Sequence, residues 1–373
     1  MLHVLCPSRD GAAWALLAGR AASGLRGRHV AAVAGSWGDA RGAHAAGLPE
    51  VVGLGSPRLA GLPAALRARR VARALRRRHG TAPVVLCWSS WMFGALHGVM
   101  PDARLTLVPS HLPAETWRST GASVRCLVPE GSGVVTGLGE AAAQRVERLP
   151  MPDLDAGWEA QRARARAMLG AQGDEAVVGL LADPPSEGDA RLFAWVMGMV
   201  HVSGERALGV ASSGSWQTRR AARYLRLHKR DWDVRLCDGP ALGWLPGCDI
   251  AVWGSDPGRV SGLDAPPLGG AVLARCAASA GVPVIAPRDP ACDALLLGAA
   301  PWLLARGPTM LMLATALHPL VIDPAQRRAA GQALRRAVRD RGDSAGFLAA
   351  LSRATGLLVR SPDQPPAAAA SAL

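Results

Sequence analysis

Residues 2–34, LHVLCPSRDGAAWALLAGRAASGLRGRHVAAVA, contain the repeating unit that decides the fold. An apolar, strand-like run at 2–6 is followed by a turn, by an alanine- and leucine-rich helical stretch at 12–25 and by a second strand-like run at 29–34. A strand, a helix and a strand in this order indicate parallel strands joined by a crossover helix. The rest of the chain repeats this unit.

Strand-like runs recur along the chain in two blocks. The first block adds runs at 50–54, 83–88, 104–108 and 124–128, with a second clear helical stretch at 59–78. An irregular segment at 131–158 follows, and its turn-prone Leu149-Pro150-Met151-Pro152-Asp153 is typical of a hinge. After a helical stretch at 161–169, the second block supplies runs at 176–181, 207–211, 233–237, 250–253 and 282–286. The same plan therefore occurs twice.

The length and the two blocks predict two domains. A chain of 373 residues is long enough for about two domains, each with its own core. We expect an α/β fold with two Rossmann-like, doubly wound domains that face an interdomain cleft, at residues 1–155 and 156–345, and a C-terminal helix with a frayed tail at 346–373. The last long helix of the second domain should begin after Asp323, which caps it ahead of Pro324, and end at Gly342.

Composition excludes several classes of protein. With 49% apolar and 19% charged residues, the chain is neither disordered nor fibrous, and it is too long for a small disulfide-stapled module. The formal net charge of +13 raises nucleic acid or an anionic membrane as a partner. Lys229 is the only lysine, so arginine supplies almost all of the positive charge. That bias indicates a GC-rich genome first and selection for polyanion binding second, and we do not expect a nucleic-acid partner.

The cysteines and the apolar runs point to the cytoplasm. The seven cysteines are an odd number, no two form a C-x-x-C pair, and most lie in apolar runs, so we expect buried thiols in a reducing compartment. Arg9 and Asp10 interrupt the apolar N-terminus before a signal-peptide core could form, and Arg306 breaks the lipid-like stretch at 295–320. No zinc-type cluster, P-loop or serine-hydrolase elbow occurs, so neither a metal nor a cofactor is expected.

Six short motifs follow one another along the two blocks. The first block contains DGAA at 10–13, GRHV at 27–30, VVLCWS at 84–89 and LTLVPSH at 105–111, and the second contains GCDIAV at 247–252 and AGVPVIA at 280–286. In their order and spacing these motifs resemble the retaining nucleotide-sugar glycosyltransferases of the GT-B fold, in particular family 4. The resemblance implies transfer of a sugar from a nucleotide-diphosphate donor, bound by the second domain, to a glycan or lipid-linked acceptor bound by the first.

Four positions depart from the pattern of that family. Its members usually place an arginine and a lysine after the first strand of the second domain, and two glutamates eight residues apart before the G-x-P-V strand. This chain has Asp183 and Glu187 at the first pair of positions, and Leu268 and Cys276 at the second. Acidic groups would repel a diphosphate. Either the donor site is rebuilt from other groups, or donor binding has been lost.

Groups that could replace the missing phosphate ligands are present. The candidates are Gly11, Arg259, Gly269, Gly270, Arg275 and Arg288. The arginines would supply charge, whereas the glycines would expose backbone amides, Gly269 and Gly270 at the expected start of a helix and Gly11 in a strand-to-helix turn. Both glycine sites also have an ordinary structural explanation, because turns favour glycine.

Candidates for the acceptor side follow predicted strands of the first domain. His111 matches the acceptor-side histidine of the family, so the resemblance implies that it orients or deprotonates acceptor groups; the alternative is a loop histidine that bonds a backbone carbonyl. Trp37 and Trp88 could stack on a sugar, although tryptophan is mainly a core residue. Ser89 could bond a hydroxylated ligand or cap the next helix.

The stretch 66–78 is an arginine-dense amphipathic helix. Such a helix could rest on an anionic membrane, at the inner face of which a lipid-linked acceptor would reside, but a solvated helix face is the commoner explanation. Two functional hypotheses from different classes follow. The first is a glycosyltransferase, and the second is a non-catalytic binding or scaffold protein that keeps the fold and has lost donor binding.

Overall fold

The structure of the chain is a computed structural model, which describes residues 1–5, 11–33, 48, 51–53, 64–79, 84–88, 90–101, 103–108, 125–129, 146–154, 157–181, 187–213, 223, 226, 234–238, 241–253, 268–287, 304–305 and 310–361. Contacts divide the chain into two compact units. Unit 1 comprises Met1–Pro152 together with Asp343–Leu373, and unit 2 comprises Asp153–Gly342. The C-terminal segment therefore belongs to the same unit as the N-terminus.

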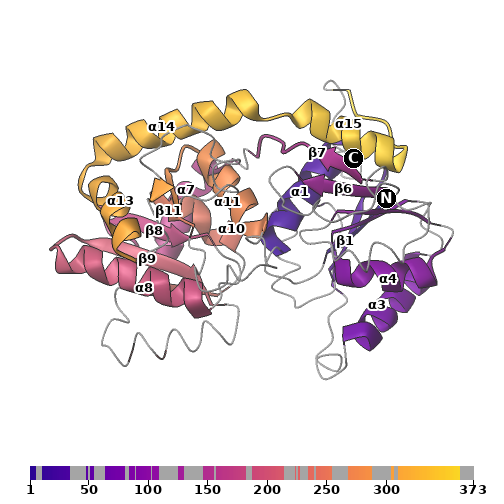
Figure 1. Cartoon of the computed structure of the whole chain (residues 1–373), viewed down its shortest axis with the longest axis horizontal. Helices are drawn as coiled ribbons and strands as arrows, with labels where there is room; N and C mark the ends of the chain where they lie inside the picture. Colours follow the sequence, from indigo (N-terminus) through magenta and orange to yellow (C-terminus); the bar gives the residue numbers. More distant parts are fainter. Residues whose placement is uncertain are drawn as a thin grey trace. The chain divides into compact units, whose positions relative to one another are not determined.

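Unit 1 is built on a parallel sheet of seven strands among the residues described (Figure 1). In spatial order the strands are β3 (Val51–Gly53), β2 (Val30–Val33), β1 (Leu2–Leu5), β4 (Val84–Cys87), β5 (Arg104–Leu107), β6 (Arg125–Pro129) and β7 (Val146–Leu149). Every neighbouring pair is parallel. The chain order reverses between β1 and β4, as in doubly wound nucleotide-binding folds. The apolar runs predict β1 to β6, whereas β7 lies in the segment interpreted as a hinge.

The helices of unit 1 are α1 (Gly11–Gly24), α3 (Ala64–His79), α4 (Ser90–Val99) and, from the C-terminus, α15 (Ser344–Thr355). Arginines from the sheet hold the end of α15. Arg104, at the start of β5, donates a hydrogen bond to the carbonyl of Thr355 at 3.0 Å, and Arg125, at the start of β6, donates to the carbonyl of Arg353 at 3.1 Å. The last carbonyls of a helix lack partners within the helix, so these guanidinium groups satisfy them and stabilise the docked α15.

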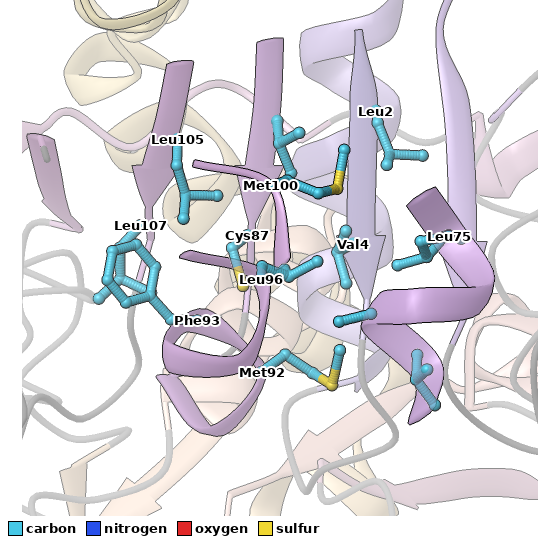
Figure 2. Close-up of a cluster of buried hydrophobic side chains, with 14 of the residues drawn as sticks. Leu2, Val4, Leu75, Cys87, Met92, Phe93, Leu96, Met100, Leu105 and Leu107 are labelled. Carbon is cyan, nitrogen blue, oxygen red and sulfur yellow. The ribbon is translucent and has the colours of Figure 1, made fainter. Parts of the chain in front are cut away.

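The core of unit 1 lies between the sheet and helices α3 and α4 (Figure 2). The labelled members of this cluster are Leu2, Val4, Leu75, Cys87, Met92, Phe93, Leu96, Met100, Leu105 and Leu107. The strand residues among them follow a period of two, because successive side chains of a strand point to opposite faces. His3, between Leu2 and Val4, therefore faces the other side of the sheet.

Unit 2 repeats the plan of unit 1 with six parallel strands in the part of the chain that is described. In spatial order they are β10 (Val234–Cys237), β9 (Ala207–Ser212), β8 (Ala176–Leu180), β11 (Ile250–Val252), β12 (Val284–Pro287) and β13 (Leu304–Ala305). The order reverses between β8 and β11. Both sheets are thus doubly wound, and the prediction of two Rossmann-like α/β domains is confirmed.

The helices of unit 2 are α7 (Trp158–Leu169), α8 (Glu187–Val202), α10 (Ala241–Trp244), the 3-10 turn η2 (Leu245–Gly247), α11 (Leu268–Ser279), α13 (Met310–Ile322) and α14 (Pro324–Arg341). Helix α14 begins where the sequence predicts, because the side chain of Asp323 accepts hydrogen bonds from the amides of Ala325 at 2.8 Å and Gln326 at 3.1 Å. Among the helices described, α13 included, none is long and apolar enough to span a bilayer.

A close backbone approach joins α14 to the turn after α11. Gly281, at the end of that turn, has φ of +80°, and its carbonyl oxygen lies against Gly331 in the middle of α14. A Cβ at position 331 would lie 1.8 Å from this oxygen. The packing of α14 on this turn therefore requires glycine at position 331. Position 281 favours glycine for a different reason, its positive φ.

Asp249, in the GCDIAV motif, ties α7 to the start of β11. Its carboxylate accepts hydrogen bonds from Arg166 Nη1 at 2.6 Å, from Arg162 and from the amide of Val177 at 2.9 Å. Arg162 also donates to the carbonyl of Cys248 at 2.9 Å. The acid at this motif position is thus a structural clamp at the amino-terminal edge of the sheet.

Candidate functional site

In open α/β sheets, ligands bind outside the carboxyl ends of the strands, at the point where the strand order reverses. In unit 1 this switch point lies between β1 and β4, and the elements that follow these strands are α1, which starts at Gly11, and Trp88. In unit 2 it lies between β8 and β11, and the helices that follow are α8 and α11.

Trp88 is part of a buried chain of hydrogen bonds in unit 1. Its indole Nε1–H donates to His3 Nδ1 at 3.3 Å, His3 Nε2 lies 3.0 Å from His29 Nδ1, and His29 Nε2 lies 3.2 Å from the carbonyl oxygen of Leu25. An indole can only donate, so Nδ1 of His3 accepts, and the proton of that ring is on Nε2. By the same reasoning, His29 accepts at Nδ1 and donates from Nε2. The chain is complete only when both rings are neutral.

Burial keeps both rings neutral. His3 is 0% exposed and His29 2%. Desolvation by burial lowers the pKa of His3 well below its usual value, and the neighbouring His29 and the N-terminal ammonium lower it further. Burial lowers the pKa of His29 to about 4, with a smaller effect from the N-terminal ammonium. These histidines were not among the candidates from the sequence; the signal was a polar residue within the apolar run 2–6.

Trp88 is a core residue. Its side chain is 0% exposed, and its ring lies 5.7 Å from that of Trp14 on α1 and 6.3 Å from that of His3. The indole has no exposed face on which a sugar could stack, so the interpretation of Trp88 as a sugar-lining residue does not fit its burial. The hydrogen bond to His3 and the contact with Trp14 instead anchor Trp88 against β1 and α1. Trp88 is thus part of the buried packing next to the switch point between β1 and β4.

Helix α11 is the element of unit 2 best suited to an anion. It follows β11, so its N-terminus lies at the carboxyl end of the sheet, and it begins Leu268-Gly269-Gly270 without an acidic residue in the first turn. The first four amides of a helix have no acceptor within the helix, and the helix dipole makes this end partly positive. Two glycines there allow a phosphate to approach the backbone closely. The role of Gly269 and Gly270 in phosphate binding stays a prediction.

Helix α11 buries Cys276, which stands where the family usually has its second glutamate. Cys276 is 0% exposed, and its thiol donates to the carbonyl oxygen of Leu154 at 3.3 Å. The side chain at this position therefore bonds to the backbone inside unit 2. Arg275, the next residue, is 5% exposed, so α11 also carries a buried guanidinium.

Several candidates lie outside the described residues: Trp37, Ser89, His111, Asp183, Arg259 and Arg288. Gly11, Glu187 and Leu268 are the first residues of α1, α8 and α11 respectively. Within the described ranges, no three His, Cys, Asp or Glu side chains lie close enough together to hold a metal ion.

No protein-family model matches this chain, and neither does any curated protein sequence. Solved structures do match it over nearly its whole length. The glycosyltransferase WaaG, involved in lipopolysaccharide biosynthesis, has a TM-score of 0.59 at 12% identity, with 95% of this chain and 100% of that chain covered. HepE of Anabaena, solved with UDP and glucose, has a TM-score of 0.58 at 13% identity, covering 95% and 98%. A glycosyltransferase from Rickettsia africae has a TM-score of 0.56 at 9% identity, covering 94% and 96%.

These matches, together with the two doubly wound sheets, show that the chain has the GT-B glycosyltransferase fold. The fold that the six sequence motifs imply is confirmed, and family 4 is consistent with it.

Proposed function

We propose that the protein is a glycosyltransferase that moves a sugar from a nucleotide-diphosphate donor, held by unit 2, to a glycan or lipid-linked acceptor, held by unit 1. The observation that carries the proposal is the start of α11, where two glycines follow Leu268 at the carboxyl end of the unit 2 sheet and no carboxylate is present in the first turn. Stabilising a departing diphosphate is the main electrostatic requirement of this chemistry, and helix amides supply such stabilisation without a metal.

The likeness in fold to HepE, which was solved with UDP and glucose, supports a nucleotide-sugar as the donor. Loss of the family's second glutamate does not remove the groups proposed here, because they are backbone amides. Its replacement, Cys276, bonds within the core of unit 2.

The proposal is tested by calorimetric titration of the protein with a panel of nucleotide-sugars. We expect binding of one donor with a dissociation constant between micromolar and millimolar, and at least a tenfold weaker constant for Gly270→Glu, because a carboxylate in the first turn repels the diphosphate. The same carboxylate favours the helix itself, so the variant should stay folded. Gly94→Glu is the matched control, since a Cβ at this α4 position meets no atom within 4 Å.

Failure of every donor to bind would refute the transferase proposal and favour the non-catalytic binding protein. Equal donor affinities of the wild type and Gly270→Glu would refute the role of α11.

For the acceptor, we propose a lipid-linked glycan reached from the inner face of a membrane. Helix α3 supports this proposal: it buries Ala68, Val71, Ala72 and Leu75 against unit 1 and exposes six arginines, Arg69, Arg70, Arg73, Arg76, Arg77 and Arg78, next to the half-exposed Leu66. Clustered cations favour anionic lipid by about 1 kcal/mol each near the surface. Sedimentation with vesicles should show binding to anionic but not neutral lipid, reduced at least tenfold in Arg70→Glu/Arg73→Glu/Arg77→Glu. Equal binding to both lipids would refute the proposed contact.

A further inference from the structure

A pocket lies in unit 2, at the edge of the sheet opposite to the start of α11. Its volume is about 380 Å³, and it lies between the segment after α7 and the first residues of β9. Residues of its lining that bear on a ligand are Gly170, Gln172, Glu175, Arg206 and Arg235. Glu175 precedes β8 and Arg206 precedes β9, so the pocket is at the amino-terminal edge of the strands. Its volume falls in the range of sites for small molecules.

Arg206 and Glu175 face this pocket without closing on each other. Ala176 pairs with Ala207 in the ladder of β8 and β9, so the preceding residues, Glu175 and Arg206, start adjacent strands. No ion pair joins them, and Arg206 is exposed and makes no hydrogen bond or ion pair with the residues described. The Glu175 carboxylate accepts only one long hydrogen bond in the described ranges, 3.3 Å from the amide of Gln172. A cation and an anion are therefore both available to a ligand.

Arg235 is held in place on the side of the pocket formed by the end of α7. Its Nη1 donates to the carbonyl of Leu169, the last residue of that helix. Gly170 follows with φ of +61°, and a Cβ there would lie 2.7 Å from the same nitrogen, so glycine leaves the space that the guanidinium occupies. Arg235 thereby compensates the negative end of α7.

The carbonyls of the loop between α7 and β8 are also satisfied by an arginine. Arg166 Nη2 donates to the carbonyl of Gly173 at 3.2 Å and to that of Glu175 at 3.0 Å. Among the described residues, the lining contains the guanidinium groups of Arg206 and Arg235 and the carboxylate of Glu175, together with the imidazole of His201. The neighbouring acids Asp174 and Glu205 do not line the pocket.

We infer that this pocket binds a small hydroxylated monophosphate of the size of a hexose phosphate, with its phosphate on Arg206 and Arg235 and its hydroxyls on Glu175 and Gln172. Guanidinium groups bind phosphate through paired, charge-assisted hydrogen bonds. A carboxylate accepts from hydroxyls but repels phosphate, so it orients the ligand with the phosphate towards the arginines. The inference does not depend on the proposed transfer reaction, because the pocket is at the opposite edge of the sheet from α11.

Calorimetric titration of the whole protein with glucose 6-phosphate, inorganic phosphate and glucose tests this inference. We expect glucose 6-phosphate to bind and glucose, which lacks the anion, not to bind. Arg206→Ala removes an exposed side chain and should weaken glucose 6-phosphate at least tenfold. Arg328→Ala is the matched control, because Arg328 is exposed on α14 and has no described partner; it should leave the affinity unchanged.

Glu175→Gln gives a prediction of the opposite sign. Removing the one carboxylate that the described residues contribute to the lining should tighten the binding of inorganic phosphate about threefold. The Gly270→Glu variant separates this site from the donor site, since it should leave glucose 6-phosphate binding intact. Absence of glucose 6-phosphate binding, or binding that survives Arg206→Ala or is lost in Gly270→Glu, would overturn the inference.

Discussion

The buried pair His3 and His29 makes the stability of unit 1 depend on pH in a way that can be worked out from the structure. An unfolded histidine titrates near pH 6.5, whereas burial lowers the pKa of His29 to about 4 and that of His3 well below its usual value. Between these values the unfolded chain binds protons that the folded chain excludes. Stability is therefore fully present above about pH 6.5 and falls as the pH is lowered below it.

The magnitude follows from the pKa shifts. Each excluded proton costs about 1.4 kcal/mol per pH unit, so lowering the pH from 7 to 5 should cost about 2 kcal/mol through His29. His3 adds a loss of the same sign, and the cost of His29 alone is already a substantial part of the roughly 5 to 15 kcal/mol that typically stabilises a protein. The Trp88–His3–His29–Leu25 chain supplies the structural reason, because a second proton on either ring would set two donors against each other.

Urea unfolding at pH 7, 6, 5.5 and 5 measures this effect, with tryptophan fluorescence of the buried Trp88 and Trp14 as the signal. We expect the slope of the free energy of unfolding against pH to approach the uptake of two protons on unfolding in the wild type. In His29→Gln, which removes one titrating group, the slope should approach one proton. His97→Gln, at a half-buried position of α4 outside this hydrogen-bond chain, is the matched control. A free energy of unfolding that is the same at pH 7 and pH 5, or an unchanged slope in His29→Gln, would show that the rings are not held neutral.

Two further predictions concern the packing of unit 2. Gly331→Ala should lower the free energy of unfolding by at least about 2 kcal/mol, because its methyl group would meet the carbonyl oxygen of Gly281. The control is Gly98→Ala on α4, where a Cβ meets nothing within 4 Å, and it should be neutral or slightly stabilising. Equal effects of the two substitutions in urea unfolding would contradict the close approach. Asp249→Asn should cost about 2 kcal/mol by weakening its bonds to two arginines, and a thermal melt unchanged from wild type would exclude the clamp.

Much of the fold could be predicted from the sequence because buried parallel strands have a simple signature. Strands covered on both faces are continuous apolar runs, and β4, β8 and β12 are of this kind. Strand β7 lacks the signature: Val146, Glu147 and Arg148 are not buried, and only Leu149 is. An edge strand with one buried residue cannot be told from a loop by composition. The sequence pattern therefore places β7 in the predicted hinge.

The candidate site was harder to predict, because its contacts join residues far apart in the chain. Trp88 follows a strand and could be interpreted either as a ligand-stacking or as a core residue. What decides between them is the imidazole of His3, 85 residues earlier in the chain, which the parallel pairing of β1 with β4 brings within hydrogen-bonding distance. A hydrogen-bond acceptor inside a strand of leucine and valine was the available clue. Its partner could be found only once the strand order was known.

The position of Cys276 limits how this fold could hold a nucleotide-sugar donor here. A glutamate at this position would place its carboxylate where the present side chain is 0% exposed and bonds a backbone carbonyl, an oxygen that cannot donate to it. The cysteine is therefore matched to its surroundings, and a carboxylate that could accept from a hydroxyl of the donor is not available at this point of α11. The first turn of α11 still offers the backbone amides of Leu268, Gly269 and Gly270. Donor affinity should consequently respond to charge placed on the first turn of α11 and stay insensitive to Cys276→Ser, which keeps a donor for the Leu154 carbonyl.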